Sequence, residues 1–364
     1  MNQEKPLRDR IDYTLLFLVF LLFCISMMAI YAGTTTQYVR ADLYEELRHI
    51  YASSQAKWFL IGVFVMVIIA FFDYEYFKYL TIPIYAFGMG LLLIVEFWGY
   101  KHNGAQRWIE YNGAGIYQPS EIMKIILVLV LAHLIFVLNQ RFSEKTIKND
   151  FIKLGLIVAV ALPPFFLVLR QPDLGSALVL ASIIAVAILV SGISYKMLGA
   201  LAALAIAGVS GIFYLFFNYV DVLINYEILE AHQLERIYGW LYPAEYASSY
   251  ALQTLNATRG IGSGQLVGSG FLNSTQAANA STPELHTDFI FAVIGEEFGF
   301  IGSTFVICVF FLLIYRMILM AIECKDLYGT YIIAGIAGML TFQIFQNIAM
   351  TIGLCRLQVL PCRF

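Results

Sequence analysis

Three carboxylates near the end of the chain have the spacing of a chemical site. Asp288 directly precedes an apolar run, and Glu296 and Glu297 lie about two turns inside it if the run is helical. Capping of a helix that starts near Phe289 would explain Asp288 or Glu284, but not a buried pair of glutamates. Buried carboxylates need cations, hydrogen-bond donors or protons. This segment therefore predicts a site with a metal ion or a positively charged partner.

A second polar segment, residues 104–124, could supply such a partner. Pro119 predicts the start of a helix, with Glu121 in the first turn, where the helix dipole favours an anion. Glu121 and Lys124 are three residues apart and share one helical face, so they either neutralise each other or contact a substrate. Trp108 is either a residue of the membrane interface or a substrate contact.

The turn that follows Arg170 is a third candidate. Pro172 and Gly175 explain the turn itself. Arg170 and Asp173 either close it by a mutual salt bridge or bind an anionic headgroup, and the sequence favours neither.

A glycine-rich segment, residues 260–270, follows Arg259. Its backbone N–H groups could cradle a phosphate, but it lacks the Gly-Lys-Ser/Thr of a P-loop. We favour the interpretation that it packs against the rest of the chain through close backbone approach.

The composition decides which elements must position these residues. The chain is 60% hydrophobic and only 13% charged, with a mean hydropathy of +0.76. These values are typical of a polytopic membrane protein. Long apolar runs without alternation predict an all-α helical bundle. The nine runs are residues 13–32, 58–72, 80–98, 122–138, 152–169, 176–190, 197–217, 289–315 and 328–350.

The charges predict the orientation. Lys5, Arg8 and Arg10 should keep the N-terminus on the cytoplasmic side, and the first run is predicted to be a retained span rather than a signal peptide. The long hydrophilic segment 218–287 then lies on the outer face. We expect one integral membrane domain, residues 1–364, with this large outer loop and with its chemistry outside the cytoplasm.

The remaining composition points away from several other classes. The five cysteines are scattered, which predicts neither a disulfide framework nor a zinc site. The net charge of −3 and the lack of a basic cluster give no reason to expect a nucleic-acid partner. Nothing in the sequence predicts an organic cofactor.

Together these segments resemble the SEDS family (shape, elongation, division and sporulation), the integral-membrane glycosyltransferases of bacterial wall synthesis. The resemblance extends along nearly the whole chain to Gly353. It rests on residues 104–109, 118–124, 171–175, 272–276 and 286–297. Residues 272–276 are more similar to the elongation members (RodA) than to the division members (FtsW).

The resemblance implies a chemistry for Asp288, which matches the catalytic aspartate of the family. The implied reaction polymerises lipid II, with undecaprenyl pyrophosphate as the leaving group. Asp288 would be the general base on the acceptor GlcNAc 4-hydroxyl, which attacks C1 of the donor MurNAc with inversion. A class B penicillin-binding protein is the implied partner, and the bacterial cytoplasmic membrane is the implied location, with ten spans.

The leaving pyrophosphate needs compensating positive charge. A divalent cation, Mg²⁺ or Mn²⁺, held by Asp288 and Glu297, could supply it. His286 is either a group that orients Asp288 or a surface histidine. The implied substrate contacts are Arg107, Trp108, Glu121, Lys124, Asp173, Arg259 and His286.

The chain departs from the family pattern after Leu354. Plausible codons for residues 355–364, shifted by one base, encode Leu-Pro-Val-Thr-Gly-Ile-Ala-Leu-Pro-Phe, which is the expected family continuation. We hypothesise that this atypical tail is a frameshift, and a chain that ends there should lack a span and be unstable or inactive.

Two other functions fit the same composition. A lipid flippase or transporter would use intramembrane carboxylates to relay protons or ions. A non-catalytic scaffold would recruit a penicillin-binding protein and would tolerate replacement of Asp288.

Overall fold

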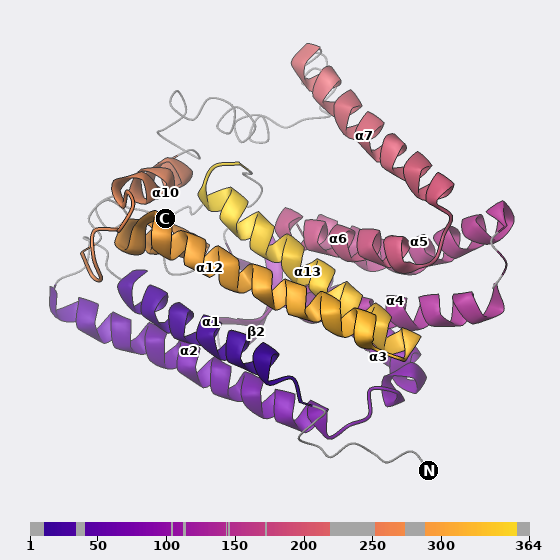
Figure 1. Cartoon of the computed structure of the whole chain (residues 1–364), viewed down its shortest axis with the longest axis horizontal. Coiled ribbons are helices and arrows are strands. Elements are labelled where there is room, and N and C mark those ends of the chain that lie inside the picture. Colours follow the sequence, from indigo (N-terminus) through magenta and orange to yellow (C-terminus); the bar gives the residue numbers. More distant parts are fainter. Residues whose placement is uncertain are drawn as a thin grey trace. The chain divides into compact units, whose positions relative to one another are not determined.

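The computed structural model describes residues 11–33, 41–102, 105–111, 114–142, 144, 146–171, 173–218, 252–273 and 288–354 (Figure 1). Three parts of the sequence predictions lie outside these residues: His286, most of the expected outer loop, and the tail 355–364.

The described chain is almost entirely helical, as the apolar runs predict. Among the described residues, eight helices are long and apolar enough to cross a membrane. With the shorter apolar helix α6, they account for the nine predicted runs, so the prediction of a multi-pass helical membrane protein is confirmed. The helices are α1 (Tyr13–Gly33), α2 (Ala41–Ala70), α3 (Tyr76–Trp98), α4 (Pro119–Arg141), α5 (Ile147–Arg170), α6 (Leu174–Val190), α7 (Tyr195–Asn218), α10 (Leu252–Ser263), α12 (Ile290–Glu323) and α13 (Leu327–Thr351).

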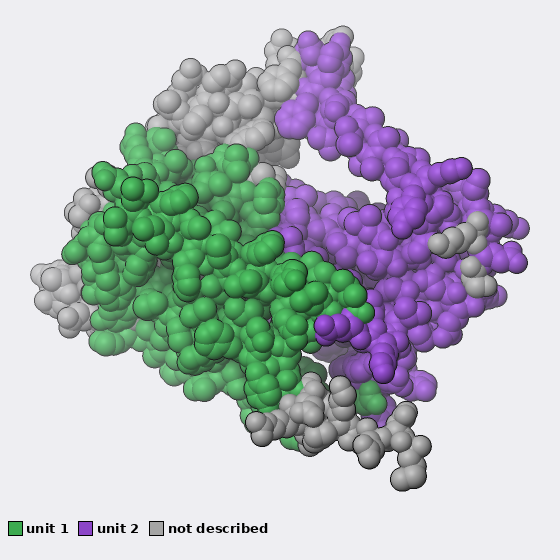
Figure 2. All heavy atoms as spheres, viewed as in Figure 1, with its two compact units in different colours: residues 1–73, 252–322, 344–355 green, residues 74–251, 323–343, 356–364 purple. Residues whose placement is uncertain are grey.

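Two compact units make up the chain, and each has its own apolar core (Figure 2). Unit 1 comprises residues 1–73, 252–322 and 344–355. It packs α1 against α12 through Leu18, Val309 and Leu313. Unit 2 comprises residues 74–251, 323–343 and 356–364. The expectation of a single domain over the whole chain stays a prediction.

Helix α4 is the centre of unit 2, since it packs against α3, α5 and α6. Its side chains Met123, Leu127 and Leu131 are almost completely buried. Pro164 inside α5 has no N–H, which leaves the carbonyl of Val160 without its helical donor. The Tyr85 hydroxyl of α3 donates to that carbonyl at 2.7 Å. The side chain replaces the missing backbone donor, as apolar surroundings require.

A small antiparallel sheet joins α3 to α4. Its strands are β1 (Tyr100–His102), β2 (Ala105–Tyr111) and β3 (Ala114–Tyr117), in the order β1-β2-β3. The sequence analysis did not predict these strands. The sheet carries Arg107 and Trp108 on its central strand and leads directly into α4.

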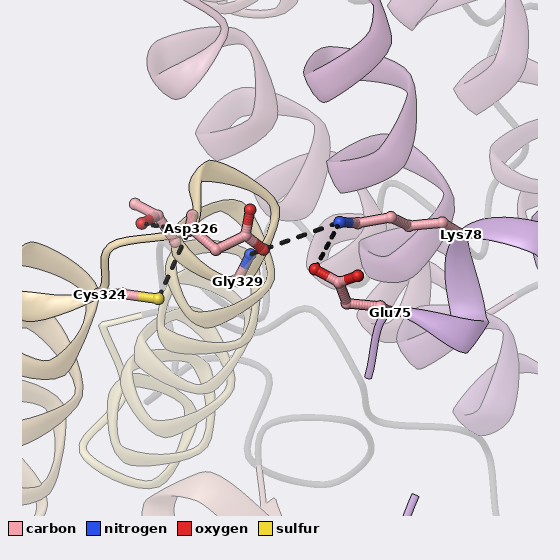
Figure 3. A network of polar contacts seen from close by, with 6 residues as sticks. Glu75, Lys78, Cys324, Asp326 and Gly329 are labelled. Atoms are coloured by element: carbon pink, nitrogen blue, oxygen red, sulfur yellow. Dashed lines mark hydrogen bonds and ion pairs between the residues drawn. The ribbon is translucent and has the colours of Figure 1, made fainter. Parts of the chain in front are cut away.

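A polar network fixes the turn between α12 and α13 to the start of α3 within unit 2 (Figure 3). The Lys78 ammonium lies 3.3 Å from a Glu75 carboxylate oxygen and 4.0 Å from one of Asp326. Asp326 also accepts a hydrogen bond from the Gly329 N–H at 3.1 Å and so caps α13. Burial, and then the charge of Asp326, raises the pKa of Tyr74 to about 12.

Candidate active site

Asp173 connects three elements of unit 2. Its carboxylate accepts from the Ser176 N–H at 3.0 Å, which caps α6. Its second oxygen accepts from the Gln118 amide at 2.7 Å and lies 3.8 Å from an Arg107 guanidinium nitrogen. Asp173 is only 2% exposed. A buried carboxylate with these partners fixes the sheet and the start of α4 relative to α6.

The alternative that Arg170 and Asp173 close their turn by a mutual salt bridge is wrong. The Arg170 side chain is exposed, and its Nε lies 3.5 Å from a Glu96 carboxylate oxygen. Asp173 is turned inward to cap α6 instead, because its short side chain reaches the Ser176 N–H.

Glu121 and Lys124 form the ion pair that their spacing predicts. The Lys124 ammonium lies 2.8 Å from Glu121 Oε2, in the first turns of α4. The two side chains differ in exposure, at 4% for Lys124 and 54% for Glu121. The positive charge is therefore held in the interior and the negative charge near the surface.

Buried donors without protein acceptors surround the start of α4. Among the described residues, no partner accepts from Arg107 Nε or from the hydroxyls of Tyr117 and Ser120. Burial, and then the charge of Glu121, raises the pKa of Tyr117, so its hydroxyl keeps its proton. Buried donors are usually satisfied. These three donors can therefore bind an anionic ligand, with Trp108 half-buried on the same strand as Arg107.

Asp288 lies in unit 1, in the turn that leads into α12. Its side chain is half-buried, whereas the next residue, Phe289, is only 3% exposed. Phe289 belongs to an apolar cluster with Ala32, Ala257, Ala292 and Val293. This anchor holds Asp288 at the edge of the core, where a carboxylate can reach a ligand.

Glu296 and Glu297 are each 1% exposed on α12, as the spacing predicts. One carboxylate oxygen of Glu297 accepts from the Leu272 N–H at 3.2 Å. The glycine-rich segment reaches the same place, since a Cβ added at Gly264 or Gly268 would overlap the α12 backbone. The interpretation of this segment as a close backbone contact is confirmed.

The predicted site residues thus fall into one group in each unit. Unit 2 brings Arg107 and Asp173 together, and separately Glu121 and Lys124. Unit 1 carries Asp288 and Glu297, together with Arg259, whose side chain is exposed on α10. Among the described residues, no three His, Cys, Asp or Glu side chains could hold a metal ion together.

Sequence reasoning missed Tyr117, Ser120 and Leu272 as contributors. The first two lie inside the polar segment 104–124 that the sequence analysis singled out, but their residue types alone do not indicate buried hydroxyls without a partner. Leu272 contributes through its backbone N–H, which every residue except proline possesses. No sequence signal could have found it.

Comparison with known proteins places these residues in one family. A model of the cell cycle proteins FtsW, RodA and SpoVE matches residues 13–363. Stage V sporulation protein E of Bacillus subtilis (strain 168) is 29% identical over 94% of this chain and 88% of its own length. The peptidoglycan glycosyltransferase MrdB of Escherichia coli (strain K12) is 30% identical over 81% of this chain and 74% of its own length.

The fold is also similar to a solved structure. A chain from a peptidoglycan synthase complex, studied for its coordination of polymerization and crosslinking, superimposes with a TM-score of 0.70. The two chains are 24% identical, and the match covers 96% of this chain and 88% of the other. This likeness supports the fold.

Proposed function

The chain belongs to the FtsW/RodA/SpoVE family of cell cycle proteins, the SEDS family, and we propose from that membership that it is a peptidoglycan glycosyltransferase that polymerises lipid II. The observation that carries the catalytic assignment is the place of Asp288. It is half-buried in the turn before α12, and its neighbour Phe289 is fixed in the core.

Asp288 acts as the general base in this proposal. It accepts the proton of the acceptor GlcNAc 4-hydroxyl while that oxygen bonds to C1 of the donor MurNAc. The bond between C1 and the pyrophosphate oxygen breaks, and undecaprenyl pyrophosphate leaves. The attack from the opposite face inverts the configuration at C1.

The donors around the start of α4, in unit 2, bind an anionic group of the substrate in this proposal. Arg107, Tyr117, Ser120 and Lys124 offer N–H and O–H groups in a buried setting, where such groups interact more strongly than in water. Glu121 and Asp173 orient Lys124 and Arg107. Trp108, Arg259 and His286 are assigned to the substrate by the family resemblance alone.

A divalent cation, Mg²⁺ or Mn²⁺, remains part of the proposal, but the described residues fit it poorly. Glu297 is buried and accepts from a backbone N–H. Mg²⁺ carried by a substrate's phosphates needs only one or two protein carboxylates, and Asp288 can supply one. We assign no step of the reaction to the cation.

The charges of the N-terminal segment support the proposed orientation. The basic N-terminal residues Lys5, Arg8 and Arg10 support a cytoplasmic N-terminus, in the bacterial cytoplasmic membrane. Asp288 then faces outward, toward the lipid II of the outer leaflet. A class B penicillin-binding protein, which crosslinks the polymer, is the proposed partner.

Polymerisation of lipid II by the purified chain with a penicillin-binding partner tests this function. We compare the chain as given with a form that carries the family continuation from residue 355, and each with its Asp288→Asn variant. We expect polymer from at least one of the two forms that carry Asp288. In the Asp288→Asn variant of that form, the polymerisation rate should fall about 1,000-fold or more, because an amide cannot accept the proton. Polymer from the Asp288→Asn variants would remove Asp288 as the base. No polymer from either form, despite folding and partner binding, would favour the transporter or the scaffold.

A further inference from the structure

Helix α12 is broken at Gly299, about three turns after Asp288. Gly299 has φ 65° and ψ −160°, which is not helical, so residues 290–298 and 300–323 form separate segments. At such a break the last carbonyls of the first segment and the first N–H groups of the second lose their helical partners. In an apolar bundle these groups must be satisfied elsewhere.

The glycine-rich segment after α10 satisfies them. Figure 1 shows α10 beside the first turns of α12. Four backbone hydrogen bonds close the break: Ser269 N–H to Glu296 O at 2.9 Å, Gly270 N–H to Glu297 O at 3.1 Å, Phe300 N–H to Gln265 O at 2.9 Å and Ile301 N–H to Leu266 O at 3.1 Å. The first segment of α12, which follows Asp288, is therefore held by chain that is distant in sequence.

The Glu297 carboxylate adds a fifth hydrogen bond, to a residue with an unusual backbone conformation. Leu272 has φ 65°, a left-handed conformation that leucine rarely adopts. Its N–H donates to Glu297 Oε1 at 3.2 Å. A fixed acceptor at this point favours the backbone conformation that Leu272 would otherwise avoid.

The conformation of Leu272 bears on the catalytic residue. The Leu272 side chain packs on the apolar cluster that contains Phe289 and Val293, and Phe289 directly follows Asp288. We propose that Glu297 is a positioning residue, which holds Asp288 through Leu272 and Phe289, and not a metal ligand. The inference rests on the proposed function of Asp288 as the base.

Substitutions at position 297 separate geometry from charge. An amide oxygen can still accept from the Leu272 N–H, so Glu297→Gln should keep kcat within about 3-fold of the wild type. Glu297→Ala removes the acceptor and should lower kcat about 30- to 100-fold, as expected when a catalytic group is misplaced. KM should change less than about 3-fold in both variants, because neither touches the substrate.

A double-mutant cycle tests the route through Leu272. Leu272→Ala keeps the N–H but removes the packing on the apolar cluster that contains Phe289, so it should also lower kcat. Combined with Glu297→Ala, it should add little, since both changes break the same connection. The proposal would be overturned if the kcat losses of the two single variants multiplied in the double variant. It would also be overturned if Glu297→Gln were as inactive as Glu297→Ala, because the reaction would then require the negative charge of Glu297.

Hydrogen exchange gives a readout that does not depend on activity. Glu297→Ala should speed amide exchange in residues 264–273 and 288–298, while Glu297→Gln leaves it near the wild-type rate. If polymerisation fails for every form but exchange follows this pattern, the contact is correct and the proposed function is not. Unchanged exchange in the Ala variant would reject the positioning role itself.

Discussion

Asp173 in unit 2 and Glu297 in unit 1 are both buried carboxylates, but their partners differ in kind. Asp173 has a side-chain amide and a guanidinium beside it, besides the N–H that it caps. Glu297 accepts from a backbone N–H in a place where two chain segments touch through glycines. The contacts of Asp173 include a charged partner, whereas the contact between Glu297 and Leu272 needs an acceptor in the right place.

This difference suits the two tasks in the proposed reaction. An anionic group of a substrate is recognised by charged and polar side chains. Carboxylates such as Asp173 orient these donor side chains and leave the position of the anion free. A general base needs fixed geometry more than it needs neighbouring charge. The backbone contacts around Glu297 supply this rigidity to the segment that follows Asp288.

The largest expected effect on stability comes from adding a side chain at Gly268, where the glycine-rich segment touches the backbone of α12. Gly268 has φ 88°, and an added Cβ would overlap the carbonyl oxygen of Glu297. We expect Gly268→Ala to destabilise the protein by about 4 kcal/mol, from a left-handed alanine and an overpacked contact. Thermal unfolding of the detergent-solubilised protein measures this loss.

Gly262 is the matched control for Gly268. It lies in α10, six residues earlier, and nothing lies within 4 Å of a Cβ placed there. Gly262→Ala should be neutral or stabilise the helix by up to about 1 kcal/mol. Equal losses of stability in Gly262→Ala and Gly268→Ala would mean that glycine is needed at these positions for chain flexibility and not for close approach of the backbone.

A smaller effect distinguishes the two carboxylates directly. In Asp173→Asn the amide oxygen still caps α6, but the Arg107 guanidinium loses its counter-charge, so we expect a loss of about 2 to 3 kcal/mol. Glu297→Gln keeps the acceptor for the Leu272 N–H and should cost less than about 1 kcal/mol. Comparable losses in the two variants would show that charge matters equally in both places.

Arg107→Gln combined with Asp173→Asn completes this test. The double variant removes both charges, so it should recover part of the stability lost in Asp173→Asn. A double variant less stable than Asp173→Asn would mean that other contacts of Arg107 contribute more to protein stability than its contact with Asp173.

The apolar runs predicted the helices because membrane spans are set by length and composition. The Glu121 and Lys124 pair and the burial of Glu296 and Glu297 followed from helical spacing. The three-stranded sheet was missed, although Asn-Gly pairs at 103–104 and 112–113 are strong hairpin signals. The partners of Asp173 and Leu272 could not be predicted, because 55 and 25 residues separate the chain positions that meet.

Asp12 makes both a cap to a backbone N–H and an ion pair with an arginine. The pH dependence of protein stability can separate these two contributions. One oxygen accepts from the Leu15 N–H at 2.9 Å and caps α1, while the other accepts from Arg316 Nε at 2.6 Å. Burial raises the pKa of Asp12, but the contacts with Leu15 and Arg316 outweigh it and hold the pKa below its usual value of 3.8. A carboxylate with a lowered folded pKa stabilises the protein above its unfolded pKa, and this stability is lost as pH falls through the folded value.

Asp12→Asn keeps the cap, since asparagine caps as well as aspartate, but it carries no charge for Arg316. We expect the wild type to be more stable than this variant by about 1 kcal/mol at pH 7, a difference that shrinks below about pH 4 and vanishes under the folded pKa. Asp12→Ala also loses the cap, so it should be about 1 kcal/mol less stable than Asp12→Asn at every pH. Thermal unfolding of the three proteins between pH 3 and pH 7 measures both differences. A gap between wild type and Asn variant that stays constant with pH would assign the whole contribution of Asp12 to its shape and none to its charge.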